Sequence, residues 1–176
     1  MKTLAFPELR QTYGYDCGAS ALQSVLVYYG IEELREDEIV QLAGTTEKDG
    51  TTPTGIMRVL QAFGLEHEAG VLTLADVCTA INYGHPVIMA LQAYRDDTRI
   101  PYAKCWDDGH WVCAIGYDAT RVYFEDPSSY KRTWLGFPQL LERWHDVGDN
   151  GKKLEHWGCI VKGTPCFIPN DSEYMA

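Results

Sequence analysis

Cys17 and His110 are the residues of this chain whose types and surroundings best suit nucleophilic catalysis. Cys17 stands where a predicted helix begins, and the free N–H groups and positive dipole end of a helix stabilise a thiolate. His110 opens a predicted strand directly after a loop, where its ring could serve as a general base. Together the two would generate a thiolate that attacks a carbonyl carbon. The ordinary alternatives are an inert buried cysteine and a surface histidine.

Asp126 and Gln11 would supply the two further groups that such a nucleophile needs. Asp126 ends the predicted strand that follows His110, so a hairpin would bring the carboxylate beside the imidazole. A carboxylate in that place fixes the tautomer and orientation of the ring. Gln11 lies shortly before Cys17 and could donate its amide into an oxyanion hole, together with the backbone N–H of Cys17. The alternatives are a strand-ending Asp-Pro turn and a surface glutamine.

The elements that must position these residues follow from hydrophobic periodicity. Apolar residues at helical spacing, with Thr73 as an N-cap and glycines as stops, predict helices over residues 17–29, 35–42, 54–63, 74–82 and 137–144. Runs rich in β-branched and aromatic residues predict strands over residues 86–91, 110–117, 121–125 and 156–162. Residues 94–108 read as a long loop. A helical half followed by an antiparallel sheet predicts an α+β fold.

Length and composition bound the class of protein. A chain of 176 residues with 45% hydrophobic residues suits one globular domain over residues 1–176. The net charge is −10 and the basic residues are scattered, so we expect no nucleic-acid partner. No apolar run approaches the ~20 residues of a membrane span. The first residues lack the apolar stretch of a signal peptide, which favours a cytoplasmic location.

The cysteines and histidines predict neither disulfides nor a metal site. The six cysteines are irregularly spaced and no export signal precedes them, so we expect free thiols. There is no Cys-x-x-Cys pair, and the five histidines are dispersed rather than placed at ligand spacing. The sequence therefore implies no metal and no cofactor.

Three ordered motifs resemble the double-glycine, or bacteriocin-processing, cysteine peptidases, which are papain-like domains often fused to peptide-exporting transporters. QTYGYDCGASALQSVLVYYG resembles the nucleophile segment of that family, GHPVIMAL the strand before its histidine, and GHWVCAIGYD with VYFEDPSS its histidine and aspartate strands. The resemblance covers roughly residues 8–145. Residues 146–176 form a C-terminal strand and tail without an assigned counterpart, and the loop over residues 94–108 is longer than the family pattern suggests.

The resemblance implies a papain-like fold in which a central nucleophile helix packs on a C-terminal antiparallel sheet. It implies Cys17 as nucleophile, His110 as general base and acid, Asp126 as the orienting group and Gln11 as the oxyanion donor. The substrate would be a peptide or protein cut after small residues such as Gly-Gly, with an export transporter as a possible partner in trans. Trp111 and Tyr13 are candidates for substrate contact.

Two other functions stay open at this point. Another nucleophile in place of water would make the protein an acyltransferase or transpeptidase, similar in layout to phytochelatin synthase. A papain-like module whose cysteine is inert would bind peptides without cleaving them. The presence of all four candidate residues favours the peptidase.

Overall fold

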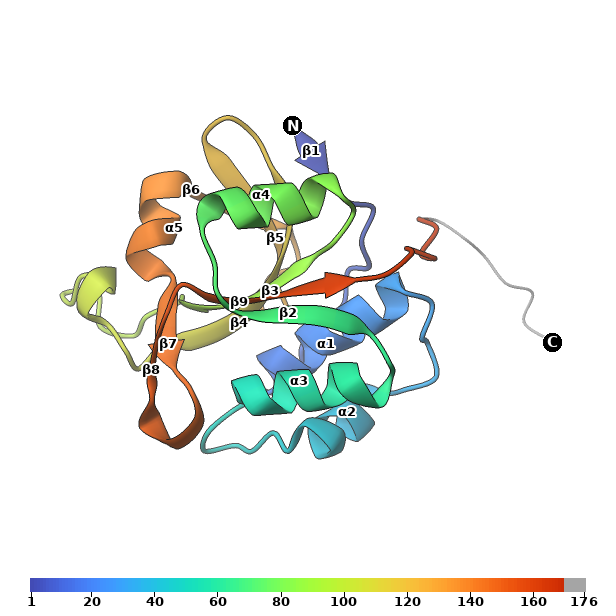
Figure 1. The fold of residues 1–176 in the computed structure, drawn as a ribbon. Helices are drawn as coiled ribbons and strands as arrows, with labels where there is room; N and C mark the ends of the chain where they lie inside the picture. The colour runs from blue at the N-terminus through green and yellow to red at the C-terminus, as the bar shows by residue number, and fades with distance from the viewer. Residues whose placement is uncertain (170–176) are drawn as a thin grey trace.

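The computed structural model describes residues 1–169, which form a layer of antiparallel strands with helices on both sides (Figure 1). The elements in chain order are β1 (Lys2–Thr3), α1 (Cys17–Tyr28), α2 (Glu36–Ala43), α3 (Pro53–Ala62), β2 (Glu66–Val71), α4 (Leu74–Asn82), β3 (Val87–Gln92), the short helix η1 (Tyr102–Lys104), β4 (Gly109–Tyr117), β5 (Arg121–Glu125), β6 (Thr133–Gly136), α5 (Phe137–Arg143), β7 (His145–Val147), the short helix η2 (Asp149–Gly151), β8 (Lys153–Glu155) and β9 (Trp157–Lys162).

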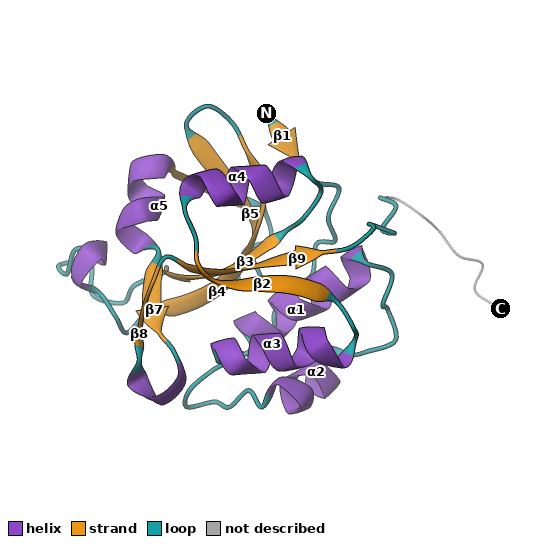
Figure 2. Ribbon diagram, viewed as in Figure 1, coloured by secondary structure: helices purple, strands orange, loops and turns teal. Residues whose placement is uncertain are grey.

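The main sheet of the described residues has the strand order β2-β9-β3-β4-β5-β6, with β1 paired to β4. Every pairing in it is antiparallel. The central strand β3 is buried along its whole length, as expected for a strand covered on both faces. β7 and β8 form a separate hairpin beside this sheet. Figure 2 shows the strands as one continuous layer between the helices.

The helices lie on both faces of this sheet. Figure 1 shows α1, α2 and α3 gathered on one side and α4 and α5 on the other. All residues of α1 except Gln23 and Val27 are buried, so α1 is the interior helix that its apolar sequence predicted. Thr73 caps α4 as expected, because its hydroxyl accepts from the backbone N–H of Asp76 at 3.2 Å.

The predicted elements are present, with boundaries that differ by one residue at most, and the α+β class is confirmed. The six cysteines are free thiols, also as expected. The sequence analysis missed β1, β2, β6, β7 and β8. These strands are short or carry polar side chains, so they lack a strong periodic signal, and their pairing partners stabilise them.

β9 has a larger role than a C-terminal extension would have. It lies inside the sheet between β2 and β3, and Cys159 and Val161 are fully buried in the core. The predicted strand over residues 156–162 is therefore part of the central structure. No helix within residues 1–169 is long and apolar enough to cross a membrane.

Candidate active site

Cys17 is the first residue of α1, and the turn before the helix leaves that helix end uncapped. Both carboxylate oxygens of Asp16 accept from the backbone N–H of Tyr13 at 3.1 Å, so the side chain turns back into the loop. No side chain of the described residues caps α1. The first N–H groups of the helix therefore stay free for an anion near Cys17.

Gly18 lets two neighbouring segments close over the start of the helix. A Cβ atom at this position would lie 2.5 Å from Cβ of Thr51 and 2.9 Å from Cδ1 of Trp111, which is closer than real contacts allow. The Trp111 indole also donates a 2.8 Å hydrogen bond to the carbonyl of Thr51. Close packing therefore requires a glycine after Cys17, because the loop that contains Thr51 and strand β4 meet at this position.

His110 and Asp126 are directly hydrogen-bonded, with 2.8 Å between Nε2 of the ring and Oδ1 of the carboxylate. The expected hairpin of β4 and β5 places them, but not directly opposite each other. The register shifts between Ala114 and Gly116, and Cys113 pairs with Glu125. Asp126 therefore lies opposite Val112 and not opposite His110. The side chains of His110 and Asp126 meet diagonally, which is within reach on one face of a sheet.

The Asp126 carboxylate is held by four hydrogen bonds. Besides His110, it accepts from the Tyr94 phenol at 2.6 Å, the Thr133 hydroxyl at 3.1 Å and the backbone N–H of Ser128 at 3.0 Å. Asp126 is only 3% exposed, and burial alone would raise its pKa. The hydrogen bonds outweigh burial and lower the pKa, so the carboxylate is ionised and fixed in place.

The His110 ring is 6% exposed and lies against the Cys17 side chain. Burial disfavours the imidazolium, but the hydrogen bond that the ring donates to Asp126 and the interaction with Cys17 prevail and raise the pKa of His110 to about 9. Because Nε2 is bonded to Asp126, Nδ1 is the ring nitrogen left for the thiol proton. The arrangement favours a protonated ring beside the sulfur at neutral pH.

Gln11 is held beside these residues at both ends of its amide. Its Nε2 donates to the carbonyl of Tyr13 at 2.7 Å, and its Oε1 accepts from the Ser128 hydroxyl at 2.6 Å. The backbone N–H of Gln11 also donates to the carbonyl of Pro127 at 3.1 Å. One hydrogen of Nε2 remains for another acceptor, since a primary amide carries two.

A buried ion pair joins the segment that carries Gln11 to the strand that ends before Asp126. Arg10 pairs with Glu125, whose side chain is 1% exposed. Burial raises the pKa of Glu125, Arg10 opposes this shift, and the resulting pKa is about 7. Arg132 lies 3.7 Å from the second carboxylate oxygen. Arg10 and Glu125 each precede a candidate site residue, so the pair fixes their separation.

Cys17 opens onto a cleft of about 780 Å³ between the loop before α3 and the β7–β8 hairpin. Trp111 lines this cleft, together with Trp106 from the long loop. Tyr13 does not line it: its ring is 59% exposed and stacks on Tyr15, which does reach the cleft. Of the two candidates for substrate contact, the geometry thus favours Trp111 and not Tyr13.

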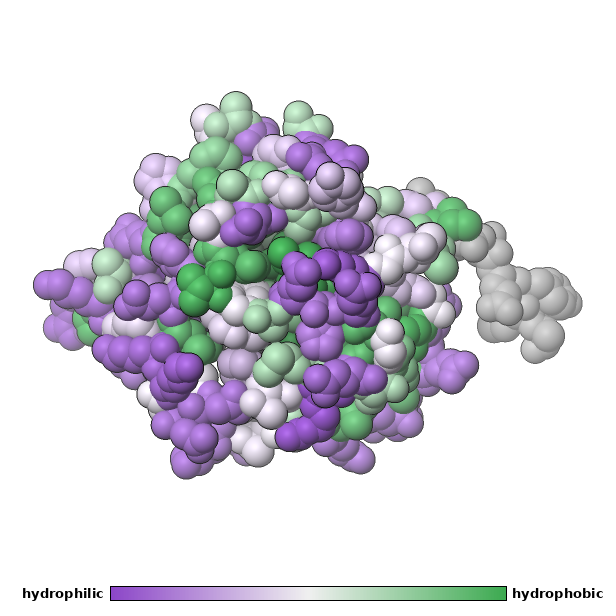
Figure 3. Space-filling view, in the orientation of Figure 1, coloured by the Kyte–Doolittle hydropathy of each residue, from purple (hydrophilic) through white to green (hydrophobic). Residues whose placement is uncertain are grey.

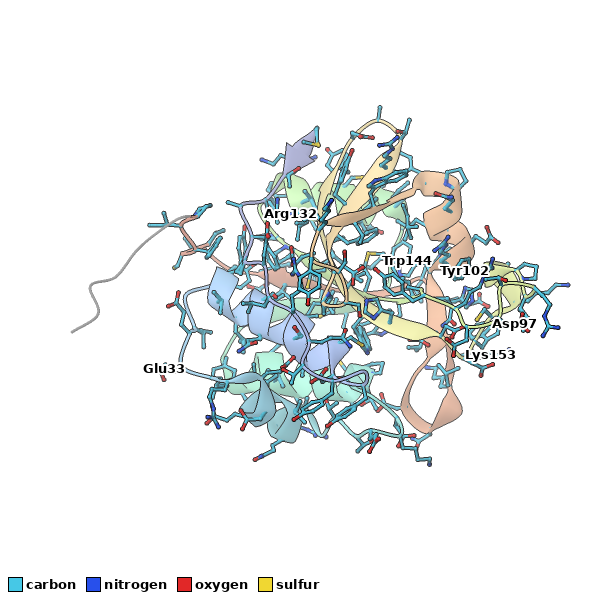
Figure 4. All side chains as sticks on the ribbon, turned by 180° about the vertical axis from the view of Figure 1, so that it is seen from behind. Glu33, Asp97, Tyr102, Arg132, Trp144 and Lys153 are labelled. Carbon is cyan, nitrogen blue, oxygen red and sulfur yellow. The ribbon has the colours of Figure 1, made fainter. Side chains whose placement is uncertain are left out.

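A second cavity of about 310 Å³ lies on the far side of His110 and Asp126. Tyr94 and Tyr102 line it, and the guanidinium of Arg143 lies 3.6 Å from the centre of the Tyr102 ring. Figure 4 shows Tyr102 in the segment that projects at one edge of the molecule. The long loop over residues 94–108 therefore contributes side chains to both cavities.

The fold is that of papain-like peptidase domains. The chain belongs to the Peptidase_C39 like family, whose model matches residues 3–151. This confirms the resemblance seen in the three motifs. It also extends the match beyond residues 8–145, into the β7–β8 hairpin.

Three solved structures share the fold. A Bacillus anthracis protein assigned to the C39-like peptidases superposes with a TM-score of 0.69 at 14% identity, over 94% of this chain and 100% of that one. The peptidase domain of Streptococcus ComA, a bifunctional ABC transporter of a quorum-sensing pathway, gives 0.63 at 18%, over 93% and 100%. A double glycine motif protease from an AMS/PCAT transporter, solved with a leader peptide, gives 0.62 at 16%, over 93% and 99%.

A sequence relative is known from an archaeon. An uncharacterised protein of Methanothermobacter marburgensis is 26% identical over 120 residues, which is 68% of this chain and 70% of the relative. Because this relative is uncharacterised, it gives no information on activity beyond the family assignment.

Sequence reasoning missed Tyr94, Thr133 and Asp146, which all lie close to the candidate residues. Tyr94 sits in the long loop, Thr133 begins the unpredicted strand β6, and Asp146 lies in the unpredicted strand β7. One signal could have drawn attention to Asp146. This acidic residue follows Trp144 closely, in a short segment that mixes apolar and polar residues and has no clear role in a turn. Nothing in the local sequence indicates that Tyr94 reaches Asp126.

Proposed function

We propose that this protein is a cysteine peptidase that hydrolyses peptide bonds with Cys17 as nucleophile. His110 acts as general base and then as general acid, Asp126 orients its ring, and Gln11 donates to the oxyanion. The observation that carries the proposal is the 2.8 Å His110–Asp126 hydrogen bond beside a cysteine at an uncapped helix start.

The reaction follows from these positions. The Cys17 thiolate attacks the scissile carbonyl carbon, and the negative charge that develops on the oxygen is stabilised by Gln11 and the backbone N–H of Cys17. The protonated His110 gives its proton to the leaving amine as the carbon–nitrogen bond breaks. Water, deprotonated by His110, then hydrolyses the thioester and releases the carboxylate product, which restores the thiolate–imidazolium pair.

The substrate class in this proposal is a peptide cut after small residues such as Gly-Gly. Support comes from the family and from the neighbouring double glycine motif protease, which was solved with its leader peptide. We also propose that the protein is cytoplasmic and forms a single domain. An export transporter is a candidate partner in trans. The acyltransferase alternative differs only in the final acceptor, so added amine nucleophiles would reveal it through transfer products.

The first test is the alkylation rate of each cysteine with limiting iodoacetamide between pH 4 and 9, read by mass spectrometry. Cys17 is 8% exposed, whereas Cys166 is exposed and serves as an accessible reference thiol. Below pH 7 we expect Cys17 to react roughly tenfold or more faster than Cys166. The His110→Ala variant should lose this advantage.

A peptide library screened for cleavage then tests hydrolysis itself. Cys17→Ala should abolish cleavage, and Gln11→Ala should lower kcat by about 10²–10³ with a smaller effect on KM. Gln61→Ala, an exposed glutamine at the end of α3, is the matched control. An unreactive Cys17 in the folded protein would remove the peptidase proposal and favour a non-catalytic binding module.

A further inference from the structure

Five acidic residues and one basic residue line the cleft beside Cys17. The carboxyl groups that line it belong to Glu47, Asp49, Asp107, Asp146 and Asp149. Lys48 is the one basic residue among the described lining residues, and it is 89% exposed and lies 3.8 Å from Asp49. A cleft with one sign of charge concentrates ligands of the opposite sign. The charge pattern alone does not make a site, so the position of each carboxylate matters.

Asp146 is the buried member of this set. It is 9% exposed and nevertheless lines the cleft. Its Oδ1 accepts from Nε2 of Gln92 at 3.1 Å and from the backbone N–H of Val147 at 2.8 Å. Within residues 1–169, no hydrogen bond reaches its Oδ2 and no lysine or arginine lies within ion-pair distance of it. One oxygen of a buried carboxylate is thus left for a ligand.

Gly109 lets the carboxylate of Asp146 pack closely against the backbone. A Cβ atom on Gly109 would lie 2.4 Å from Oδ1 and 2.6 Å from Oδ2 of Asp146. Gly109 is exposed, lines the same cleft and directly precedes His110. The carboxylate of Asp146 therefore lies in the wall of the cleft, against the residue that precedes His110.

The β7–β8 hairpin holds Asp146 rigidly. The backbone N–H of His156 donates to the carbonyl of Trp144 at 2.8 Å, and the Trp144 indole donates to the carbonyl of Trp157 at 2.8 Å. Trp144 is completely buried, and Figure 4 shows it in the interior while Lys153 lies at the outer edge. Figure 3 shows hydrophilic side chains over the hairpin. Asp146 is thus pre-positioned for a ligand.

A buried carboxylate without a lysine or arginine partner carries a free-energy cost. Burial raises the pKa of Asp146 to about 7, against the opposing effects of Val147, Gln92 and the His110 charge. A cation bound at Oδ2 would offset this cost. A residue with a strongly shifted pKa that lines a cleft is a candidate functional residue.

We propose that the cleft beside Cys17 binds a positively charged group of the substrate, and that Asp146 is the residue that receives it. This inference rests on the proposed peptidase function and names the substrate class: a peptide with a cationic group near the scissile bond. The group is either a lysine or arginine side chain or an amino-terminal ammonium.

Charged thiol reagents test the inference without any need for catalysis. Cys17 is labelled at pH 8, where Asp146 is mostly ionised, with trimethylammonioethyl, sulfonatoethyl or methyl methanethiosulfonate, and its rate is read by mass spectrometry. The neutral methyl reagent corrects for intrinsic thiol reactivity. We expect Cys17 to favour the cationic over the anionic reagent, and this ratio to fall about threefold to tenfold in Asp146→Asn.

The matched control is Glu33→Gln, which also removes one negative charge. Glu33 is exposed, and Figure 4 places it at the opposite end of the molecule from Lys153, whose ammonium lies 4.2 Å from the Trp106 ring of the cleft. The control should leave the reagent ratio unchanged. The asparagine preserves the acceptor for Gln92 and Val147, and circular dichroism checks its folding.

Irreversible peptidyl acyloxymethyl ketones distinguish the two sources of charge. One carries lysine behind an acetylated amino terminus, a second carries norleucine behind a free amino terminus, and a third carries norleucine and an acetyl group. If the first ketone labels Cys17 faster than the third and this advantage is lost in Asp146→Asn, the cationic group is a side chain. If the second ketone does so, the cationic group is the amino terminus. Equal labelling by all three would count against the inference.

The failures of the two proposals can be told apart. If Cys17 is inert toward the ketones but keeps the cationic preference of the small reagents, the peptidase proposal fails while the cation site stands. If Cys17 is activated and cleaves peptides but its reagent ratio is the same in the original protein and Asp146→Asn, the cation site is excluded. Should Asp146→Asn not fold, the ratio in the original protein still decides, because a ratio insensitive to added salt overturns the inference.

Discussion

The phenol of Tyr94 donates a 2.6 Å hydrogen bond to Oδ2 of Asp126, the oxygen that His110 does not use. The Tyr94 ring also meets the His110 ring edge-on, with 5.5 Å between the centroids. Tyr94 has a φ of 54°, in the left-handed region that a tyrosine adopts only at a cost of roughly 1–2 kcal/mol. Strained residues of this kind cluster at functional sites, so the Tyr94–Asp126–His110 chain defines a positioning device.

Tyr94→Phe tests this chain. Loss of a hydrogen bond to a charged group is worth roughly 1.5–3 kcal/mol, part of which reaches the transition state. We expect kcat/KM for peptide cleavage to fall about threefold to tenfold and the acidic limb of the pH profile to shift. Tyr130→Phe, on a ring that is 93% exposed, is the control. Identical pH profiles in Tyr94→Phe and the original protein would contradict the positioning role.

The raised pKa of His110 predicts a pH-dependent contribution to stability. The pKa of His110 is about 9 in the folded protein against an ordinary value of 6.5, so the protein stabilises the protonated ring. The contribution is fully present below about pH 6.5 and is lost as the pH rises through 9. The stability difference between the original protein and His110→Gln should shrink over this range by on the order of 3 kcal/mol. Urea unfolding at a series of pH values measures it, and a constant difference would contradict the prediction.

Asp146 should show the stability cost of an unpaired buried carboxylate. Its folded pKa of about 7 lies above the ordinary value of 3.8, so the carboxyl group favours folding below pH 4, and this contribution is lost as the pH rises through 7. Asp146→Asn should therefore become more stable relative to the original protein between pH 4 and 7. Thermal unfolding at both limits tests this, and a variant that is less stable at pH 8 than at pH 4, relative to the original, would refute it.

Gly18→Ala should destabilise the protein and disturb Cys17. Alanine favours a helix over glycine by about 1 kcal/mol, but the new methyl group would meet Thr51 and Trp111, and overpacking costs about 1–3 kcal/mol. We expect a lower melting temperature and a changed Cys17 alkylation rate. Gly14→Ala in the preceding loop, where a Cβ meets nothing within 4 Å, should have little effect. Equal behaviour of the two variants would show that the close packing at Gly18 is unimportant.

Arg10→Ala should leave the buried Glu125 without its main partner. Removing one member of a buried pair costs about 3–5 kcal/mol, whereas an exposed pair is worth less than about 1 kcal/mol. Arg35→Ala is the control, because Arg35 and its partner Asp37 are 77% and 59% exposed. Adding Glu125→Gln to Arg10→Ala should restore part of the stability, since the uncompensated charge is then gone. Chemical denaturation measures the free energy of unfolding of the original protein, of Arg10→Ala, of Arg35→Ala and of the double variant.

Much of the candidate site could be predicted from local patterns. The helix that begins at Cys17, the strand that begins near His110 and the hairpin that ends at Asp126 each have a strong periodic signal and clear turn residues. Their order along the chain already suggested a nucleophile, a base and an orienting acid. Local sequence was sufficient here because helix α1 forms its own backbone hydrogen bonds, and β4 and β5 pair with each other across a short turn.

The tertiary structure alone decided which other residues join them. Tyr94 reaches Asp126 from a loop, and Asp146 reaches the cleft from a three-residue strand held by Trp144 and Trp157. Short strands such as β7 have no stability of their own, since their hydrogen bonds and packing come from partners distant in the chain. Their positions, and with them the acidic character of the cleft at Cys17, depend on non-local contacts that no local periodicity records.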